Sequence, residues 1–315
     1  MKKLLVVFFG LLSASVSRAQ PTYSTTDKAY VASVEKAFMF MRQGHCDSCL
    51  TYYQKAFAIT QKSALSTLRA AACAYQCGQD DQAVTFLNQA ARLAFWEVES
   101  IWANRNENAE FDPVRSSFFG TYLQEAVDKQ KIALGRNPQL ERALAQIFDE
   151  DQRVRLRADT VGRRYGFNSP QIKPVWEAMR RLDSLNLPKV EQILERYGYP
   201  GKRLVGERQS ITAWLVVQHS PLAIQETYLP LIQAAADRGD LEKANLALLI
   251  DRIRVFKGQQ QLYGSQVKNG VDGKPNGFHP IEDEANVNKR RAAMGMEPLE
   301  EYAERFGFTY RVPND

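Results

Sequence analysis

The sequence lacks the short motifs that mark the common hydrolase and nucleotide-binding sites. It has only three histidines, His45, His219 and His279, which lie far apart and form no H-E-x-x-H zinc motif. It also has no G-x-S-x-G nucleophile elbow and no glycine-rich phosphate loop. These absences disfavour zinc proteases, serine hydrolases and phosphate-loop enzymes, and the sequence predicts no metal and no cofactor.

Long apolar runs are missing too, apart from one at the start. Leu4 to Leu12 follows Lys2 and Lys3 and precedes Ser17-Arg18-Ala19, whose small residues suit a signal peptidase. A bilayer-spanning helix needs about 20 apolar residues, and this run has about half as many. Residues 1–20 are therefore predicted to be a signal peptide, which leaves an exported protein, periplasmic or secreted, without a membrane span.

A strong excess of one charge is absent as well. The formal net charge is +5, and cleavage after residue 20 would remove Lys2, Lys3 and Arg18, which leaves +2. Acidic and basic residues are interspersed, as in DEDQRVRLR at 149–157. Because a nucleic-acid-binding protein is expected to carry a basic stripe with aromatic residues, the sequence predicts no nucleic-acid partner.

What is present begins with helical repeats in residues 21–134. Apolar residues recur at helical spacing, in two pairs of helices, over 29–43, 47–59, 63–76 and 80–93. The pairs resemble tetratricopeptide repeats of about 34 residues, with two clear units and an Asp-Pro turn before a last helix. A repeat module of this kind predicts a protein or peptide partner.

All four cysteines lie in these repeats. Cys46 and Cys49 are at the start of one helix, and Cys73 and Cys77 are at the end of the next. Neighbouring helices run antiparallel, so paired positions keep a nearly constant index sum, which favours Cys46 with Cys77 and Cys49 with Cys73. Two disulfides are predicted because an exported protein meets an oxidising compartment. A four-cysteine zinc site is the alternative.

Residues 135–315 are predicted to form a second, mainly α-helical domain. Asn186 with Pro188, and Pro230, should break or kink helices, and Asp240 should cap a helix that starts at Leu241. The apolar run 211–218 could be a strand, but its flanking residues favour a helix. The expected helices lie over 138–157, around 176–183, and over 190–197, 211–218, 241–257 and 298–306.

The C-terminal part of this domain has turn chemistry instead. Tyr263–Val267 and Phe278–Ile281 are short and extended, and Asn-Gly and Asp-Gly pairs lie between them. Asp283 should then cap a helix that ends at Gly295. The fold class is therefore mainly α, with N-terminal tetratricopeptide-like repeats, a C-terminal helical domain and a small β-hairpin.

Six short motifs rich in polar residues are spread over this domain. They are Asp151-Gln152-x-x-Arg155, Gly198-Tyr199-Pro200-Gly201, Val217-Gln218-His219, Asp251-Arg252-Ile253, Gln261-Leu262-Tyr263-Gly264-Ser265-Gln266 and Asn288-x-Arg290-Arg291. Together the motifs resemble a bacterial family known as a domain of unknown function, whose members are often exported and sometimes follow tetratricopeptide repeats. In that family the position of Ser265 is more often threonine. The resemblance covers about residues 140–303 and implies a fold and a shared polar cluster, with no established activity.

The candidate catalytic residues are His219 and an orienting carboxylate, Asp251 or Asp183, because an imidazole held by a carboxylate is a common general base. A lone histidine between two helices suits a structural role equally, and Asp251 could instead pair with Arg252 or bind the loop at 261–266. The candidate ligand-binding residues are amides, a phenol and charged groups that suit a glycan, a peptide or an anionic group: Asp151, Gln152, Arg155, Gln218, Arg252, Gln261, Tyr263, Gln266, Arg290 and Arg291.

Two functions therefore stand as hypotheses. The first is an exported binding or interaction protein that engages its partner through the helical repeats. The second is a cell-envelope or extracellular hydrolase that uses His219 and a carboxylate as acid and base on a glycan or peptide. An open cleft around His219 would favour the hydrolase, and a closed network would favour the binding protein.

Overall fold

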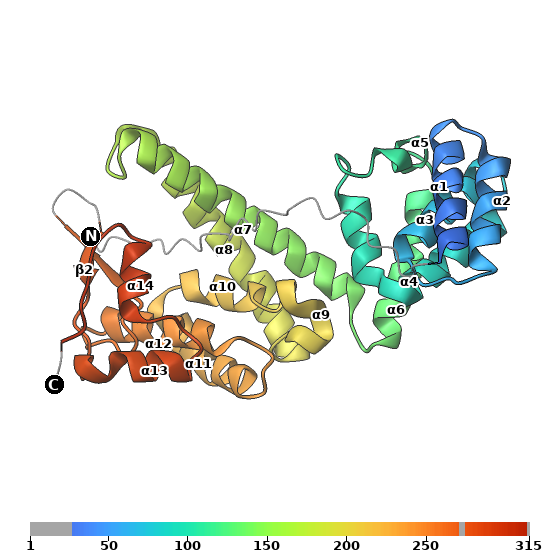
Figure 1. The fold of residues 1–315 in the computed structure, drawn as a ribbon. Helices are drawn as coiled ribbons and strands as arrows, with labels where there is room; N and C mark the ends of the chain where they lie inside the picture. Colours follow the sequence, from blue (N-terminus) through green and yellow to red (C-terminus); the bar gives the residue numbers. More distant parts are fainter. Residues whose placement is uncertain (1–26, 271–274, 314–315) are drawn as a thin grey trace. The chain divides into compact units, whose positions relative to one another are not determined.

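The computed structural model describes residues 27–270 and 275–313, so the predicted signal peptide lies outside the described residues. The chain divides between Pro138 and Gln139 into two compact units (Figure 1), and each is described by itself. No helix within the two described stretches is long and apolar enough to cross a membrane.

The N-terminal unit consists of helix pairs joined by short turns. Helix α1 packs on α2, α3 packs on α4, and α6 packs on α4. The side chains of Asp27 and Ser63 accept hydrogen bonds from backbone N–H groups at the starts of α1 and α3, which fixes where these helices begin. The elements are α1 (Lys28–Arg42), α2 (Cys46–Phe57), α3 (Ala64–Gln76), α4 (Asp80–Ala103), η1 (Ala109–Phe111), α5 (Asp112–Arg115) and α6 (Phe119–Ala133).

Helix α4 is longer than the sequence predicts. The expected end near 93 is a kink at Ala94, where φ is −163° and ψ is 82°, and the helix then continues to Ala103. Phe95 and Val98 after the kink are buried in the same core as Leu87 before it. The burial of these apolar groups explains why the chain resumes a helix rather than a loop.

The C-terminal unit begins with two long helices joined as a hairpin (Figure 1), α7 (Pro138–Tyr165) and α8 (Lys173–Tyr197), with the short η2 (Pro170–Ile172) between them. The prediction that α7 ends near 157 was wrong. Ala158 on α7 packs with Ile172 and Val175 in a small core, which extends the helical hairpin beyond that point.

The main core of this unit lies among α8 and three shorter helices. Trp214 and Val217 of α10 are buried in it, which confirms the helix predicted for 211–218. The further elements are α9 (Lys202–Gln209), which the sequence did not predict, α10 (Thr212–His219), α11 (Leu222–Asp237) and α12 (Lys243–Phe256).

Two prolines lie inside helices that were expected to break or kink. Helix α8 continues through Pro188, and α11 continues through Pro230. A proline removes one backbone hydrogen bond, and buried side chains on both sides of it can offset that loss. Met179 precedes Pro188 and Val190 follows it, and both are buried.

Asp240 does not cap α12, so that prediction was wrong. The helix starts at Lys243, and the carboxylate of Asp240 accepts a hydrogen bond from Arg238 Nε at 3.1 Å. Asp240 packs so closely on Gly201 that a Cβ atom there would lie 2.4 Å from the Asp240 Cβ. This approach explains why a glycine ends the 198–201 turn.

A short antiparallel hairpin and two helices complete the fold, with β1 (Val267–Asn269), β2 (Pro275–Phe278), η3 (Glu284–Asn286), α13 (Val287–Ala293) and α14 (Leu299–Glu304). Val267 pairs with Phe278, so the strands lie a few residues from the predicted segments, and part of their turn lies outside the described residues. Asp283 precedes η3 without a side-chain cap. The predicted fold class, mainly α with a small hairpin, is confirmed.

Candidate functional site

Three helices of the C-terminal unit bring four ionisable side chains together. Asp151 and Arg155 lie one turn apart on α7, Asp183 lies on α8, and His219 is the last residue of α10. Arg155 donates hydrogen bonds of 2.7–3.0 Å to Asp151 and one of 2.6 Å to Asp183 Oδ1. We refer to these four residues as the Arg155 cluster.

His219 lies against the buried carboxylate of this cluster. Its Nδ1 atom is 3.6 Å from Asp151 Oδ1, slightly beyond a normal hydrogen bond. Burial lowers the pKa of His219 to about 4, with help from the positive charge of Arg155 and against the attraction of Asp151. The imidazole is therefore neutral at pH 7 and is a weak base.

The two carboxylates bound to Arg155 differ in acidity. Burial would raise the pKa of Asp151, but the contact with His219 and the bonds from Arg155 hold it well below its usual range. Burial raises the pKa of Asp183 to about 6, and the negative charge of Asp151 adds to this effect against the attraction of Arg155. Asp183 is thus the group of the cluster that titrates closest to neutral pH.

Three more predicted residues lie at or near the cluster. Gln152 Nε2 donates to Asp151 Oδ2 at 2.9 Å. Arg252 of α12 is 3% exposed, and burial together with the charge of Arg155 lowers its pKa to about 10. Gln218 precedes His219 on α10 and is 2% exposed, so its amide is removed from solvent. Polar residues from four helices thus contribute to this region.

Asp251 belongs to a different network, which holds the loop at 261–266. Its Oδ1 atom accepts from the backbone N–H groups of Leu262 and Tyr263 at 2.6 and 3.1 Å, and its Oδ2 accepts from those of Tyr263 and Ser265 at 3.2 and 2.9 Å. The residue is fully buried, and burial raises its pKa against these hydrogen bonds. The carboxylate is therefore occupied by backbone groups.

The two glutamines of the loop close it internally. Gln261 Nε2 donates to the carbonyls of His279 and Gln266 at 2.7 and 3.1 Å, and its Oε1 accepts from Gln266 N–H at 2.8 Å. Gln266 Nε2 donates to Ser265 Oγ at 3.0 Å. The Gln261 amide thus satisfies backbone groups, and the buried Gln266 amide donates to a side-chain hydroxyl of the loop, so neither is free to bind a glycan or peptide.

The two arginines of α13 bind the same loop. Arg290 Nε donates to the carbonyl of Leu262 at 2.8 Å, and Arg291 Nη1 donates to that of Tyr263 at 2.6 Å. Arg291 is 1% exposed, and its guanidinium lies 4.8 Å from the ring centroid of Tyr302. Neither arginine offers the open guanidinium that an anionic ligand would need.

The predicted site residues therefore separate into two groups. The carboxylate beside His219 is that of Asp151, so the expected pairing of His219 with Asp251 or Asp183 was wrong. Asp251 binds the loop, as its structural alternative predicted, and Asp183 reaches the cluster through Arg155. Sequence spacing could not show this, because the partners come from helices far apart in the chain.

The Arg155 cluster is nearly closed to solvent. The side chains of Asp151, Arg155 and His219 are 2%, 4% and 6% exposed, and that of Asp183 is 21% exposed. A hollow of about 580 Å³ lies on α8, but no residue of the cluster lines it. Its lining residues are Pro174, Glu177, Ala178, Arg181, Leu182 and Leu185. Access to the cluster is therefore limited to the side of Asp183.

The model of a family of unknown function, DUF6624, matches residues 138–312, which is more than half of the chain. The chain belongs to the DUF6624 family. No curated protein and no solved structure matches it. The resemblance predicted from the sequence is thus confirmed at the level of the family.

Sequence reasoning missed two residues of the DUF6624 domain: Tyr302, which completes the loop network, and Asn288, which joins α13 to α14. Tyr302 donates its hydroxyl to the Ser265 carbonyl at 3.2 Å and packs its ring under Arg291. Asn288 donates to Glu300 at 2.8 Å and accepts from Leu299 N–H at 2.8 Å. Tyr302 is isolated in sequence and gave no signal, whereas Asn288 stood in a motif that was read for its arginines.

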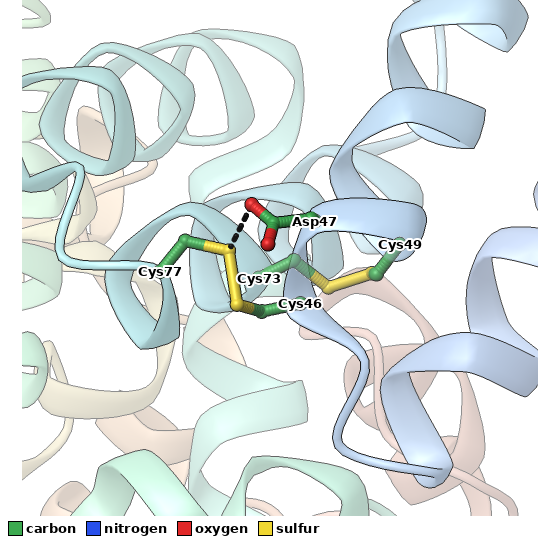
Figure 2. Close-up of a disulfide and its surroundings, with 5 residues drawn as sticks. All are labelled: Cys46, Asp47, Cys49, Cys73 and Cys77. Carbon is green, nitrogen blue, oxygen red and sulfur yellow. Dashed lines mark hydrogen bonds between the residues drawn. A yellow bond between two sulfur atoms is a disulfide. The ribbon is translucent and has the colours of Figure 1, made fainter.

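The N-terminal unit has the two predicted disulfides (Figure 2). Cys46 is bonded to Cys77 and Cys49 to Cys73, with Cα atoms 5.6 and 6.1 Å apart. Cys49 and Cys73 are fully buried, whereas Cys46 and Cys77 are partly exposed. Asp47 Oδ1 lies 3.3 Å from Cys77 Sγ. The pairing was predictable because antiparallel helices keep a constant index sum.

Removing both disulfides is expected to cost more stability than the sum of the two single losses. The 49–73 loop lies inside the 46–77 loop, so either bridge alone restricts most of the same segment. We expect each double serine or alanine replacement, at Cys46 with Cys77 or Cys49 with Cys73, to lower the free energy of unfolding by about 1 kcal/mol, and the fourfold variant by about 3 kcal/mol. Urea unfolding measures this, and additive losses would contradict it.

Proposed function

We propose that the protein is exported and acts as a binding protein, in which a helical-repeat module carries the partner site and the DUF6624 domain is a rigid support. Export is supported by the signal-peptide pattern of residues 1–20 and by the two disulfides, which persist in oxidising compartments.

The observation that favours a binding protein over a hydrolase is that the Arg155 cluster is nearly closed to solvent. A general base must reach its substrate and works best with a pKa near the working pH. His219 is 6% exposed at its side chain, and its pKa of about 4 makes it a poor proton acceptor from a substrate. The cluster therefore fits the role of a buried polar network that holds α7, α8 and α10 together better than it fits the role of a catalytic centre.

The N-terminal unit offers exposed apolar groups that suit a protein or peptide partner. Phe118 is 72% exposed, Trp96 is 64% exposed and Met39 is 44% exposed. Aromatic residues are the side chains most enriched at protein interfaces. Met39 also lines a hollow of about 400 Å³ on α1, together with Glu35, Phe38, Arg42 and Gln43.

Two measurements test the proposal. Fractionation with mass determination should find a mature chain that lacks about the first 20 residues, and a cytoplasmic full-length chain would refute export. A photo-crosslinking residue at Phe118 or Trp96 should give a discrete protein or peptide adduct in cells, whereas the same residue at the exposed control Arg203 should not. No adduct at either position would refute this partner surface.

A hydrolase remains the second candidate, favoured by one observation. Asp183 has a pKa of about 6, and among the four side chains of the cluster it is the one that is partly exposed to solvent. In such an enzyme Asp183 would move the proton, and His219 with Asp151 would position Arg155. Hydrolysis of a glycan or peptide by purified protein, abolished in Asp183→Asn without a fall in melting temperature, would favour this candidate over the binding protein.

A further inference from the structure

The positive charge of the chain is concentrated in one stretch of the DUF6624 domain. Residues 153–181 contain eight arginines and lysines against two acidic residues, a net charge of +6. The other 286 residues contain 33 basic and 34 acidic residues, a net charge of −1. The stretch forms the far half of the α7–α8 hairpin and the turn that joins the two helices (Figure 1), and we refer to it as the hairpin tip.

Seven of these eight cations lie at the surface. Arg155 is the exception, because it is buried in its cluster. Helix α7 exposes Arg153, Arg157, Arg163 and Arg164, and α8 exposes Lys173, Arg180 and Arg181. In the described part of the chain, only Arg163 among the seven forms an ion pair, with Asp159 at 2.8 Å. The charge of the tip is therefore not neutralised within the domain.

Exposed apolar side chains lie among these cations. Tyr165 and Phe167 at the turn are 48% and 42% exposed, and Leu156 on α7 is 64% exposed. Phe167 is not loose, since its ring covers Gly162 so closely that a Cβ atom there would lie 2.2 Å from it. Arg164 lies 5.2 Å from the ring centroid of Tyr165. The turn thus presents two exposed aromatic rings, and the ring of Tyr165 lies next to the guanidinium of Arg164.

We propose that the hairpin tip docks the protein on a membrane surface that contains anionic lipid. Clustered cations next to a membrane bind anionic headgroups, and aromatic rings lie at the headgroup level of a bilayer. The exposed rings lie at the turn of the hairpin, which suits shallow insertion. A nucleic acid or an acidic protein could also bind the positive charge of the tip, but neither requires exposed aromatic side chains at the turn.

This inference adds a membrane-docking site to the proposed exported binding protein and does not depend on which partner the repeats hold. Vesicle binding is measured with the purified, oxidised chain. Its failure would therefore leave the export and crosslinking tests unaffected, and failure of those tests would leave vesicle binding unaffected.

The test is co-sedimentation with phosphatidylcholine vesicles with and without phosphatidylglycerol. Binding is expected only with phosphatidylglycerol and should weaken as salt rises. Each cation at an anionic surface contributes a factor of about five, so Arg163→Gln with Arg164→Gln should weaken binding about 25-fold. Phe167→Ser should weaken it severalfold, because the ring would no longer enter the interface.

The matched control removes the same charge elsewhere. Arg203 and Arg208 lie on α9, and both side chains are exposed. The variant with Arg203→Gln and Arg208→Gln should bind the vesicles within about twofold of the wild type. No binding to phosphatidylglycerol vesicles, or equal losses in the tip and control variants, would overturn the proposal. The proposal would also be overturned if the protein bound an oligonucleotide or polyglutamate more tightly than the vesicles and Phe167→Ser left that binding unchanged.

Discussion

Replacing Asp251 by alanine is expected to lower the free energy of unfolding of the DUF6624 domain by about 4 kcal/mol. The carboxylate accepts from three backbone N–H groups, those of Leu262, Tyr263 and Ser265, and it is fully buried. Alanine would leave these donors buried without an acceptor, at about 1–3 kcal/mol each. For a domain of this size the melting temperature should fall by about 10 °C.

Calorimetry of the purified variant measures this loss. Asp237→Ala is the control, because Asp237 is exposed near the end of α11 and its bond to Gln233 is local. That change should alter stability by no more than about 0.5 kcal/mol. A fall of less than about 2 °C for Asp251→Ala would show that the loop keeps its conformation without this carboxylate.

This network changes what the sequence motifs mean. Amides on a glycine-containing loop and arginines on α13 suggested ligand recognition, but the Gln261 amide and both arginines bind backbone groups of the loop or of its neighbours. Gly264 has φ of 66°, and a Cβ atom there would meet Leu299 at 2.8 Å, so the motif is explained by backbone geometry and close packing. A motif that resembles a binding site can therefore be the signature of a fixed loop.

The helices were largely predictable because periodicity and caps are local properties. Apolar spacing marked α1 to α4, flanking residues marked α10, and the nearly constant index sum of paired positions on antiparallel helices identified both disulfides. Prediction failed where distant packing decided the outcome. Helix α8 passes through Pro188 because buried residues lie on both sides of it, and Asp240 lies beside Gly201 instead of capping α12.

The candidate site was only half predictable for the same reason. The spacing of Asp151 and Arg155 puts both on one face of α7, which is visible in the sequence. That His219 and Asp183 meet this pair depends on how α8 and α10 pack, and no local pattern contains that information. The hairpin tip is the opposite case, since its charge could be counted in the sequence. The segment 149–157, which suggested interspersed charges, covers only the start of the basic stretch and includes three acidic residues.

The Arg155 cluster should give the domain two opposed pH dependences, one from His219 and one from Asp183. The pKa of His219 falls from 6.5 to about 4 on folding. Between these values the unfolded chain binds a proton that the folded domain does not, so stability is lost as pH falls, by about 3 kcal/mol.

Asp183 acts in the other direction. Its pKa rises from 3.8 to about 6 on folding, so between these values the folded domain binds the proton and stability is lost as pH rises. Its side chain is 21% exposed, and we expect about 2 kcal/mol after allowance for screening by solvent. In the wild type the two effects largely cancel between about pH 4 and 6.

Single replacements should uncover each effect. Relative to the wild type, His219→Gln should lose stability as pH rises from about 4.5 to 6, and Asp183→Asn should gain it. Over this range the two variants should diverge by about 3 kcal/mol. Urea unfolding at several pH values measures the difference from the wild type, which removes the titration of other groups. Parallel curves for both cluster variants would mean that neither group changes its proton affinity on folding, and the Arg155 cluster would then be open to water in solution.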